Sequence, residues 1–172
     1  MLMLQQQARV DSLTGLVNRR VLDEALTTAL TTRVSRQGAA LVLVDVDSFE
    51  LINDRHGHPV GDDALAHIAD VLRGVVRPGD AVLSRTGGDE LAVLLPDCPA
   101  DVAVRRAHDV LDAVRSAPLV LPGGGLLGIW ISLGVAHAPS HAVGLEELHA
   151  AADAALHAAK RGGRGRVELA AS

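Results

Sequence analysis

The chain has 172 residues, of which 48% are hydrophobic and 22% charged, a composition typical of one folded globular domain and not of a disordered tail. Its formal net charge of −5 argues against nucleic-acid polymers as partners, because such binding depends on Lys and Arg contacts to phosphates. Phe49 and Trp130 are the only aromatic residues, which excludes stacking platforms for single-stranded nucleic acid.

The first predicted elements are a helix end, a turn, a helix and a strand. Residues 1–10 are interpreted as the helical end of an upstream linker, and residues 11–172 as one domain. A turn at 11–15 leads into a helix from about Asn18 to Thr32, because apolar residues recur there at helical spacing. Residues 39–47 (AALVLVDVD) predict a fully buried strand that ends in acids. A loop over 48–61 then precedes a helix from about Asp62 to Val75.

The remaining elements begin with a hairpin. Pro78 and Gly79 precede two strands, 81–86 and 91–96, which are joined through Gly87 and Gly88. A helix over about 100–116, a strand over 126–136, a helix over about 145–160 and a short strand within 161–169 complete the pattern. This order predicts an α+β domain in which helices pack on a mostly antiparallel sheet.

Cysteine usage and hydropathy indicate the compartment. Cys98 is the only cysteine, so an internal disulfide and a cysteine-based zinc site are both excluded. Such a chain fits a reducing environment, and we expect a cytoplasmic location. No apolar stretch is long enough to cross a bilayer, so we expect no membrane contact by this domain.

Acidic residues stand at the ends of two predicted strands. Asp45 ends a buried strand, and Asp89 and Glu90 follow the glycine pair of the hairpin. If these strands are neighbours, the three carboxylates converge and repel one another, a conflict that a divalent cation such as Mg²⁺ removes. Gly87 and Gly88 would let the backbone approach a phosphate closely. The alternative is an ordinary hairpin whose turn is solvated.

Four separated stretches resemble the signature segments of GGDEF domains, the diguanylate cyclases, in the family's order. They are DSLTGLVNRR, VDVDSFELINDRHGHPVGDDAL, RTGGDELAVLLP and AAKRGGRGRV. The resemblance implies a fold similar to nucleotidyl cyclases and polymerase palms. It also implies that two GTP molecules are joined into cyclic di-GMP with release of two pyrophosphates. Each subunit of a homodimer would bind one GTP, and each 3′-hydroxyl would attack the other nucleotide's α-phosphate.

The resemblance also implies a role for individual acidic residues. Asp45, the main-chain carbonyl of Val46, Asp89 and Glu90 match the positions that hold Mg²⁺ or Mn²⁺, with two ions in each active site. Asp89 and Glu90 are the implied catalytic residues, and Asp89 would help to deprotonate the attacking hydroxyl.

Further positions match substrate contacts of the family. Asn53 and Asp62 match guanine-reading positions, and Lys160 and Arg164 match positions that hold the β- and γ-phosphates. Each has an alternative interpretation: a loop-capping side chain for Asn53, a helix N-cap for Asp62, and cations favoured by a helix C-terminus for the other two. Further implied GTP contacts are Phe49, Gly87 and Gly88.

The sequence departs from the family pattern in four places. Glu50 replaces a usual lysine, and it either binds metal or points to water; Leu91 replaces a phenylalanine, and His157 a common tyrosine. Arg77 and Asp80 resemble an RxxD site for inhibition by cyclic di-GMP, but six residues instead of five separate Asp80 from the glycine pair. The extra residue implies a strand bulge or a shifted loop, and the two residues either bind product or form a surface ion pair. Glu50 favours an alternative function, a regulatory module that binds GTP or cyclic di-GMP without catalysis.

Overall fold

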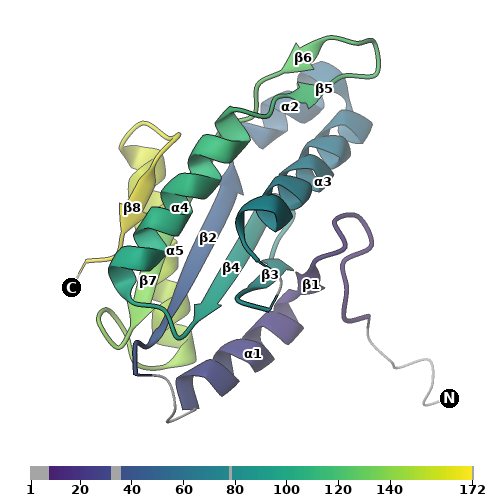
Figure 1. The fold of residues 1–172 in the computed structure, drawn as a ribbon. Coiled ribbons are helices and arrows are strands. Elements are labelled where there is room, and N and C mark those ends of the chain that lie inside the picture. Colours follow the sequence, from purple (N-terminus) through teal and green to yellow (C-terminus); the bar gives the residue numbers. More distant parts are fainter. Residues whose placement is uncertain (1–7, 32–35, 78, 172) are drawn as a thin grey trace, which may run out of the picture.

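The computed structural model describes residues 8–31, 36–77 and 79–171 (Figure 1). Six strands form one mixed sheet in the order β1-β3-β4-β2-β7-β8, and helices cover both of its faces. Its strands are β1 (Val17–Asn18), β2 (Ala39–Val46), β3 (Val82–Arg85), β4 (Glu90–Pro96), β7 (Ile131–Ala138) and β8 (Val167–Leu169). A separate hairpin contains β5 (Leu119–Val120) and β6 (Leu126–Leu127), and the helices are α1 (Arg19–Thr31), α2 (Phe49–His56), α3 (His58–Val75), α4 (Ala100–Arg115) and α5 (Leu145–Arg161).

Strand β2 is the centre of the molecule. It pairs antiparallel with β4 on one side and β7 on the other, and all eight of its residues are buried. Because side chains alternate across a strand, Val42 and Val44 lie in a core with α3 and α4, whereas Leu41 and Leu43 lie in a second core with α1 and α5. The predicted α+β class and mostly antiparallel sheet are confirmed; only the β1–β3 and β7–β8 pairs are parallel.

Gly134 of β7 has no side chain, and this lets α5 lie directly on β7. A Cβ atom added at Gly134 would meet the backbone nitrogen of Leu156 at 2.3 Å and the carbonyl oxygen of Ala152 at 2.4 Å. Apart from Cys98, the buried hydrophobic residues are Ala, Val, Leu and Ile, as the scarcity of aromatic residues requires. This close approach brings the C-terminal end of α5 to the end of β2.

The predicted loop over 48–61 was wrong, because this segment forms α2 and the start of α3. Gly57, with φ of 89°, separates the two helices, and Pro59 lies in the first turn of α3. Proline is tolerated there because its missing N–H would have no partner within the helix. Asp62 therefore lies inside α3 and is not its N-cap.

Differences elsewhere concern short elements and the ends of the chain. The strand predicted over 126–136 is divided into β6 and β7, with residues 128–130 between them. Residues 1–7, Thr32 and Pro78 lie outside the described residues, and residues 8–10 are not helical. The predicted helix start near Asn18 is close to that of α1, and Asn18 Oδ1 accepts a hydrogen bond from the Val21 backbone N–H at 3.0 Å.

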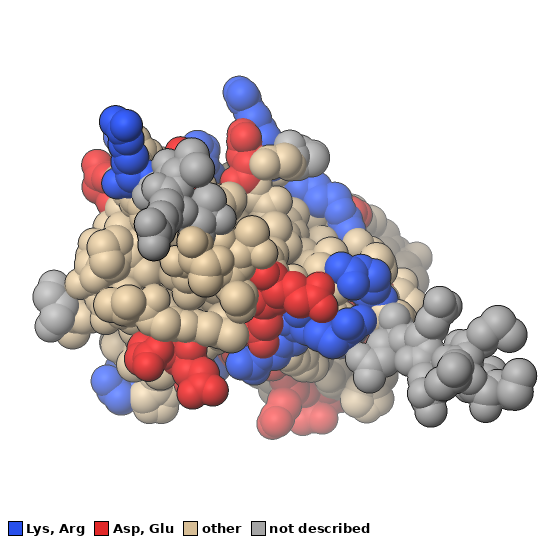
Figure 2. Space-filling model, turned by 90° about the horizontal axis from the view of Figure 1, so that it is seen from below, with Lys and Arg blue, Asp and Glu red and all other residues tan. Residues whose placement is uncertain are grey.

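The surface seen from the end where α1 lies shows acidic and basic side chains interspersed, with no single basic patch on this face (Figure 2). Charged side chains along α1 form ion pairs, Arg20 with Glu24 and Arg19 with Asp23. Within the described residues, no helix combines the length and the apolar composition needed to cross a membrane.

Candidate active site

Asp45 is a buried carboxylate near the end of β2. It follows Leu41 and Leu43 on the strand face that α5 covers, and the residue is 7% exposed. One of its oxygens, Oδ2, forms an ion pair with the Lys160 ammonium from the last turn of α5. The other oxygen, Oδ1, is buried and has no hydrogen-bond partner. An ionised carboxylate with an unpartnered buried oxygen is ready to accept a further cation or proton.

The hairpin turn between β3 and β4 lies beside the end of β2. Glu90 is the direct partner of Asp45 in the β2–β4 register, and the backbone N–H of Val46 donates to the carbonyl oxygen of Asp89 at 3.3 Å. The two strands are therefore neighbours, which is the condition under which the sequence predicted that the carboxylates converge. The Asp89 carboxylate lies close enough to Asp45 for its charge to raise the pKa of Asp45.

The ionisation of this cluster reflects burial and mutual charge. Burial is the largest cause that raises the pKa of Asp45, to about 6; the Lys160 hydrogen bond opposes the rise, and the charge of Asp89 adds to it. Burial would lower the pKa of Lys160, but the hydrogen bond and charge of Asp45, together with Asp89 and Asp47, raise it. Lys160 therefore stays protonated and partly neutralises an otherwise unfavourable carboxylate pair.

The predicted convergence of three carboxylates is only partly present. Glu90 Oε1 accepts a hydrogen bond from Thr86 Oγ1 at 2.8 Å, and no group of three His, Cys, Asp or Glu side chains within the described part of the chain forms a preformed metal site. Asp45 and Asp89 remain as a pair of hard oxygen donors, one with an unpartnered oxygen. Such a donor pair fits a hard divalent cation, which commonly takes one or two carboxylates from the protein.

Arg85 holds the glycine turn in place, a feature that the sequence analysis missed. Its Nε donates to the carbonyl of Gly87 at 3.2 Å and its Nη2 to that of Gly88 at 2.8 Å, while Nη1 donates to Asp11 Oδ1 at 3.2 Å. Asp11 also accepts from the backbone and hydroxyl of Thr14. No spacing pattern could have linked Arg85 to Asp11, because 74 residues separate them.

Packing and backbone conformation do not explain why two glycines form this turn. A Cβ atom at Gly88 would meet nothing within 4 Å, and one at Gly87 would meet only Glu90 Cβ at 3.6 Å. Neither glycine has a positive φ. The fold leaves open space over this turn, into which a ligand could come close to the backbone.

The predicted guanine-reading residues lie where α2 meets α3. A Cβ atom at Gly61 would meet Asn53 Oδ1 at 1.8 Å and Phe49 Cζ at 3.2 Å, so these two side chains converge over the glycine. Asn53 Oδ1 is buried without a hydrogen-bond partner, and it caps no loop. Asp62 follows Gly61 in the sequence and is exposed.

Arg164 lies three residues beyond the end of α5, in the loop that leads to β8. Its Nη1 donates to the hydroxyl of Ser48 at 3.1 Å, next to the start of α2. Both residues line a cavity of 410 Å³ whose wall includes Leu51 and the half-exposed Trp130. Arg164 thus approaches the start of α2, whereas Lys160 contacts Asp45 near the end of β2.

Arg77 and Asp80 lie at the far end of the hairpin from the glycine turn. Strands β3 and β4 pair in regular register from Val82 opposite Leu94 to Arg85 opposite Leu91, so the extra residue is not a bulge within this pairing. Arg77 and Asp80 are exposed and form no ion pair with each other or with other described side chains. Together with Arg106 they line a cavity of 910 Å³.

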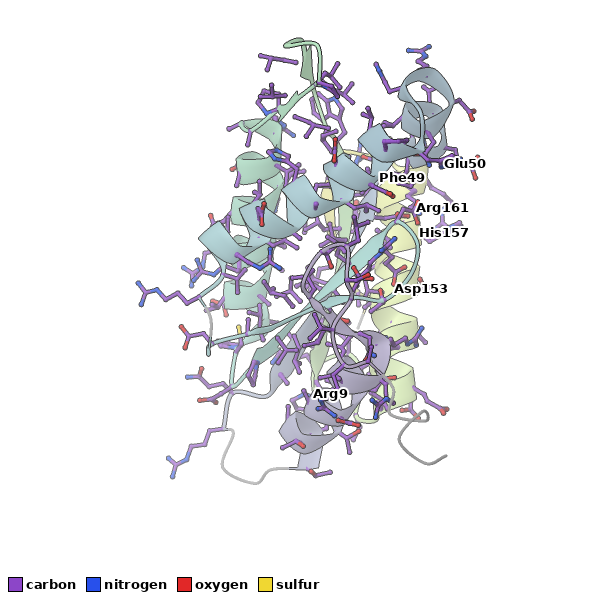
Figure 3. The ribbon with its side chains drawn as sticks, turned by 90° about the vertical axis from the view of Figure 1, so that its right-hand side faces the viewer. Arg9, Phe49, Glu50, Asp153, His157 and Arg161 are labelled. Carbon is purple, nitrogen blue, oxygen red and sulfur yellow. The ribbon has the colours of Figure 1, made fainter. Side chains whose placement is uncertain are left out.

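The other departures from the family pattern fall in different environments. Leu91 is fully buried in the core, whereas Glu50 and His157 are exposed. Figure 3 shows Glu50 and Phe49 of α2 on the same side of the molecule as His157 and Arg161 of α5. Glu50 has no hydrogen bond or ion pair with the described residues and points to solvent.

Comparisons with known proteins identify the family to which this chain is similar. A family model described as "Diguanylate cyclase, GGDEF domain" matches residues 8–166. The diguanylate cyclase TpbB of Pseudomonas aeruginosa is 39% identical over 168 residues, which are 97% of this chain and 38% of TpbB. The uncharacterized protein YhcK of Bacillus subtilis is 40% identical over 94% of this chain and 45% of its own length. The chain therefore spans less than half the length of these relatives.

Solved structures show the same fold. The GGDEF domain of TpbB (YfiN) superposes with a TM-score of 0.89 at 38% identity, covering 94% of both chains. The GGDEF domain of DgcB from Caulobacter crescentus, solved in complex with cyclic di-GMP, gives a TM-score of 0.87 at 32% identity over 98% of this chain and 96% of that one. From its sequence signatures, its sheet topology and these matches, we conclude that the chain belongs to the GGDEF domain family of diguanylate cyclases.

Proposed function

We propose that this chain is a diguanylate cyclase domain that condenses two GTP molecules into cyclic di-GMP and releases two pyrophosphates. The observation that carries the proposal is the pairing of the Asp45 and Asp89 carboxyl groups, from neighbouring strands, beside the Lys160 ammonium. Family membership supports it, as does the cyclic di-GMP complex of the DgcB domain.

The carboxylate pair accounts for the expected metal. Mg²⁺ or Mn²⁺ bound by Asp45 and Asp89, with the carbonyl of Val46 and with Glu90 as further ligands, would supply Lewis-acid polarisation of the α-phosphate. We expect two ions in each active site. Lys160 already serves as the cationic partner of Asp45, and its ammonium can exchange that carboxylate for a phosphate oxygen of GTP.

Guanine recognition is assigned to the junction of α2 and α3. A carboxylate such as that of Asp62 can accept hydrogen bonds from both N1–H and the 2-amino group of guanine, which adenine cannot offer. Asn53 would contribute its buried, unpartnered Oδ1 as a second acceptor, with Phe49 packed beside it. A site of this kind discriminates against analogues that lack the matching groups, by a factor on the order of 10⁴.

The chemical step joins two nucleotides that face each other in a homodimer. Asp89 accepts the proton of the attacking 3′-hydroxyl; the oxygen then forms a bond to the α-phosphorus, and the bond to the pyrophosphate leaving group breaks. Glu90 would contribute to the site as a further ligand of the metal. Lys160 and Arg164 hold the β- and γ-phosphates, and the open backbone at Gly87 and Gly88 lets the triphosphate approach.

The second candidate is a non-catalytic module that binds GTP or cyclic di-GMP. The exposed Glu50 favours it, since an acid in the first turn of α2 removes a positive charge expected near the transferring phosphate. Arg77, Asp80 and Arg106, lining a separate cavity, could receive cyclic di-GMP in either case.

Product analysis separates the two functions. Purified domain incubated with Mg²⁺ and GTP is expected to release pyrophosphate and to form cyclic di-GMP, identified by liquid chromatography and mass spectrometry. Asp89→Ala should abolish product, whereas Asp153→Ala, on the exposed face of α5, should not. If no product forms at high protein concentration, and Asp89→Ala leaves GTP affinity unchanged in calorimetry, the catalytic proposal fails.

A further inference from the structure

Three successive residues after α5 have left-handed backbone conformations. The φ angles are 120° at Gly163, 64° at Arg164 and 56° at Gly165. Glycine adopts such angles without strain, but a residue with a Cβ atom pays roughly 1–2 kcal/mol. Arg164 therefore needs support from the rest of the protein to remain in this conformation, and such strain is a reason to look for a function.

Asp47 and Ser132 provide that support. The Ser132 hydroxyl donates to Asp47 Oδ1 at 2.6 Å. The Gly165 backbone N–H donates to Asp47 Oδ2 at 3.0 Å and also lies 3.2 Å from the Ser132 hydroxyl oxygen. Ser132 is fully buried in β7 beside the end of β2, and the Asp47 backbone N–H donates to the carbonyl of Trp130 at 2.8 Å. The carboxylate is thus anchored on the rigid sheet.

This anchor determines where Arg164 lies. The Arg164 backbone N–H donates to the carbonyl of Ala159 at 3.0 Å, so the residue is held between the end of α5 on one side and Gly165 on the other. From there its guanidinium reaches the Ser48 hydroxyl and lines the 410 Å³ cavity. Without Asp47 the Gly165 N–H would keep only its 3.2 Å contact with Ser132, and Arg164 could relax to an ordinary conformation with a different direction.

We propose that Asp47 is a positioning residue for substrate binding: it clamps Gly165 so that Arg164 is presented to the phosphates of GTP. The proposal rests on the proposed function, because it takes Arg164 to be a phosphate contact. Asp47 has no assigned role in the site as described above, and its carboxylate is already used by two donors.

A double-mutant cycle on GTP affinity tests the clamp. Arg164→Ala removes a charge-assisted hydrogen bond, which predicts about 10- to 100-fold weaker binding of a GTP analogue that resists attack at the α-phosphate. Asp47→Ala should weaken binding about 5-fold or more, and Asp47→Asn, which keeps one acceptor, by less. If Asp47 acts through Arg164, Asp47→Ala has no further effect in the Arg164→Ala background.

Two controls exclude a general loss of structure. Asp23→Ala removes another carboxylate that joins two elements, through its 2.8 Å contact with His149 near the other end of α5, and should leave affinity unchanged. Amide hydrogen exchange without nucleotide should show faster exchange at Gly165 in Asp47→Ala, while the β2 amides stay protected. This second measurement reports on the clamp independently of GTP.

The outcomes are distinguishable. Unchanged GTP affinity in Asp47→Ala, effects that multiply in the double variant, or unchanged exchange at Gly165 would each overturn the clamp. Tight GTP binding without cyclic di-GMP formation would overturn only the proposed catalysis. A parent domain that binds no GTP would overturn both.

Discussion

Replacing Asp45 by Asn is expected to stabilise the domain at neutral pH in the absence of metal, although Asp45 is central to the proposed chemistry. Asn has the shape of a protonated carboxyl group but cannot ionise. In the folded protein, ionised Asp45 lies buried between Asp89 and Lys160, and one of its oxygens has no partner. The substitution removes the charge that this environment disfavours.

The magnitude follows from the pKa of Asp45, which is raised from 3.8 to about 6 with burial as its largest cause. A tenfold change in an ionisation equilibrium corresponds to about 1.4 kcal/mol, so ionising Asp45 costs the folded state on the order of 3 kcal/mol more than the unfolded chain. Below pH 3.8 Asp45 is protonated, and the folded state does not bear this cost. The corresponding stability of the parent is lost as the pH rises through about 6. For 172 residues it corresponds to roughly 6–12 °C in Tm.

Thermal and urea denaturation with a chelator, at about pH 4 and about pH 7.5, measure this effect. Asp45→Asn should exceed the parent's stability at the higher pH and match it at the lower one. Asp153→Asn, an exposed substitution on α5, should leave the stability unchanged at both pH values (Figure 3). A variant that is less stable than the parent at about pH 7.5, or a difference that does not depend on pH, would refute the reasoning.

Further outcomes are expected for four other variants. Glu50→Lys should raise kcat about 10-fold with little change in GTP affinity, measured by steady-state kinetics, because it restores a cation near the transferring phosphate. Asp11→Ala should release Arg85 from one of its anchors and lower the free energy of unfolding by about 1–3 kcal/mol in urea denaturation. Gly134→Ala should lower the free energy of unfolding by about 3 kcal/mol or more, since the new Cβ would meet backbone atoms of α5. Gly74→Ala, whose new Cβ would meet nothing within 4 Å, should stabilise α3 by about 0.5–1 kcal/mol in the same assay.

Long periodic segments were predictable from the sequence, and short or proline-containing ones were not. The buried strand β2 and the helices α4 and α5 follow directly from their apolar patterns. Helix α2 has only eight residues and one buried side chain, Ile52, so its pattern is too short to stand out from a loop. Pro59 reinforced the error, because proline breaks a helix in its interior but is favoured in its first turn.

The candidate site could be predicted where its residues follow strand ends and could not where it depends on side-chain partners. The neighbouring positions of Asp45 and Glu90 result from strand pairing. The contact of Glu90 with Thr86 depends on a side-chain rotamer that no spacing reveals. The same holds for Asp47, whose carboxylate contacts the Gly165 backbone, and for Arg85, whose guanidinium contacts the Asp11 side chain, because both partners are distant in sequence.

Glu50 connects stability with the departure from the family pattern. Helix α2 begins after Ser48, whose side chain makes no capping hydrogen bond, and Glu50 is the one acid in its first turn. An acid at this position interacts favourably with the helix dipole, typically by 0.3–1 kcal/mol, so a lysine there would weaken the start of α2 while adding charge suited to the phosphates. At Asp45, too, stability and the proposed function are opposed. Its ionised form destabilises the free domain, but this is the form that binds a cation. We infer that a bound metal ion supplies the further positive charge that ionised Asp45 lacks in the free domain, so metal and nucleotide binding should raise Tm more in the parent than in Asp45→Asn.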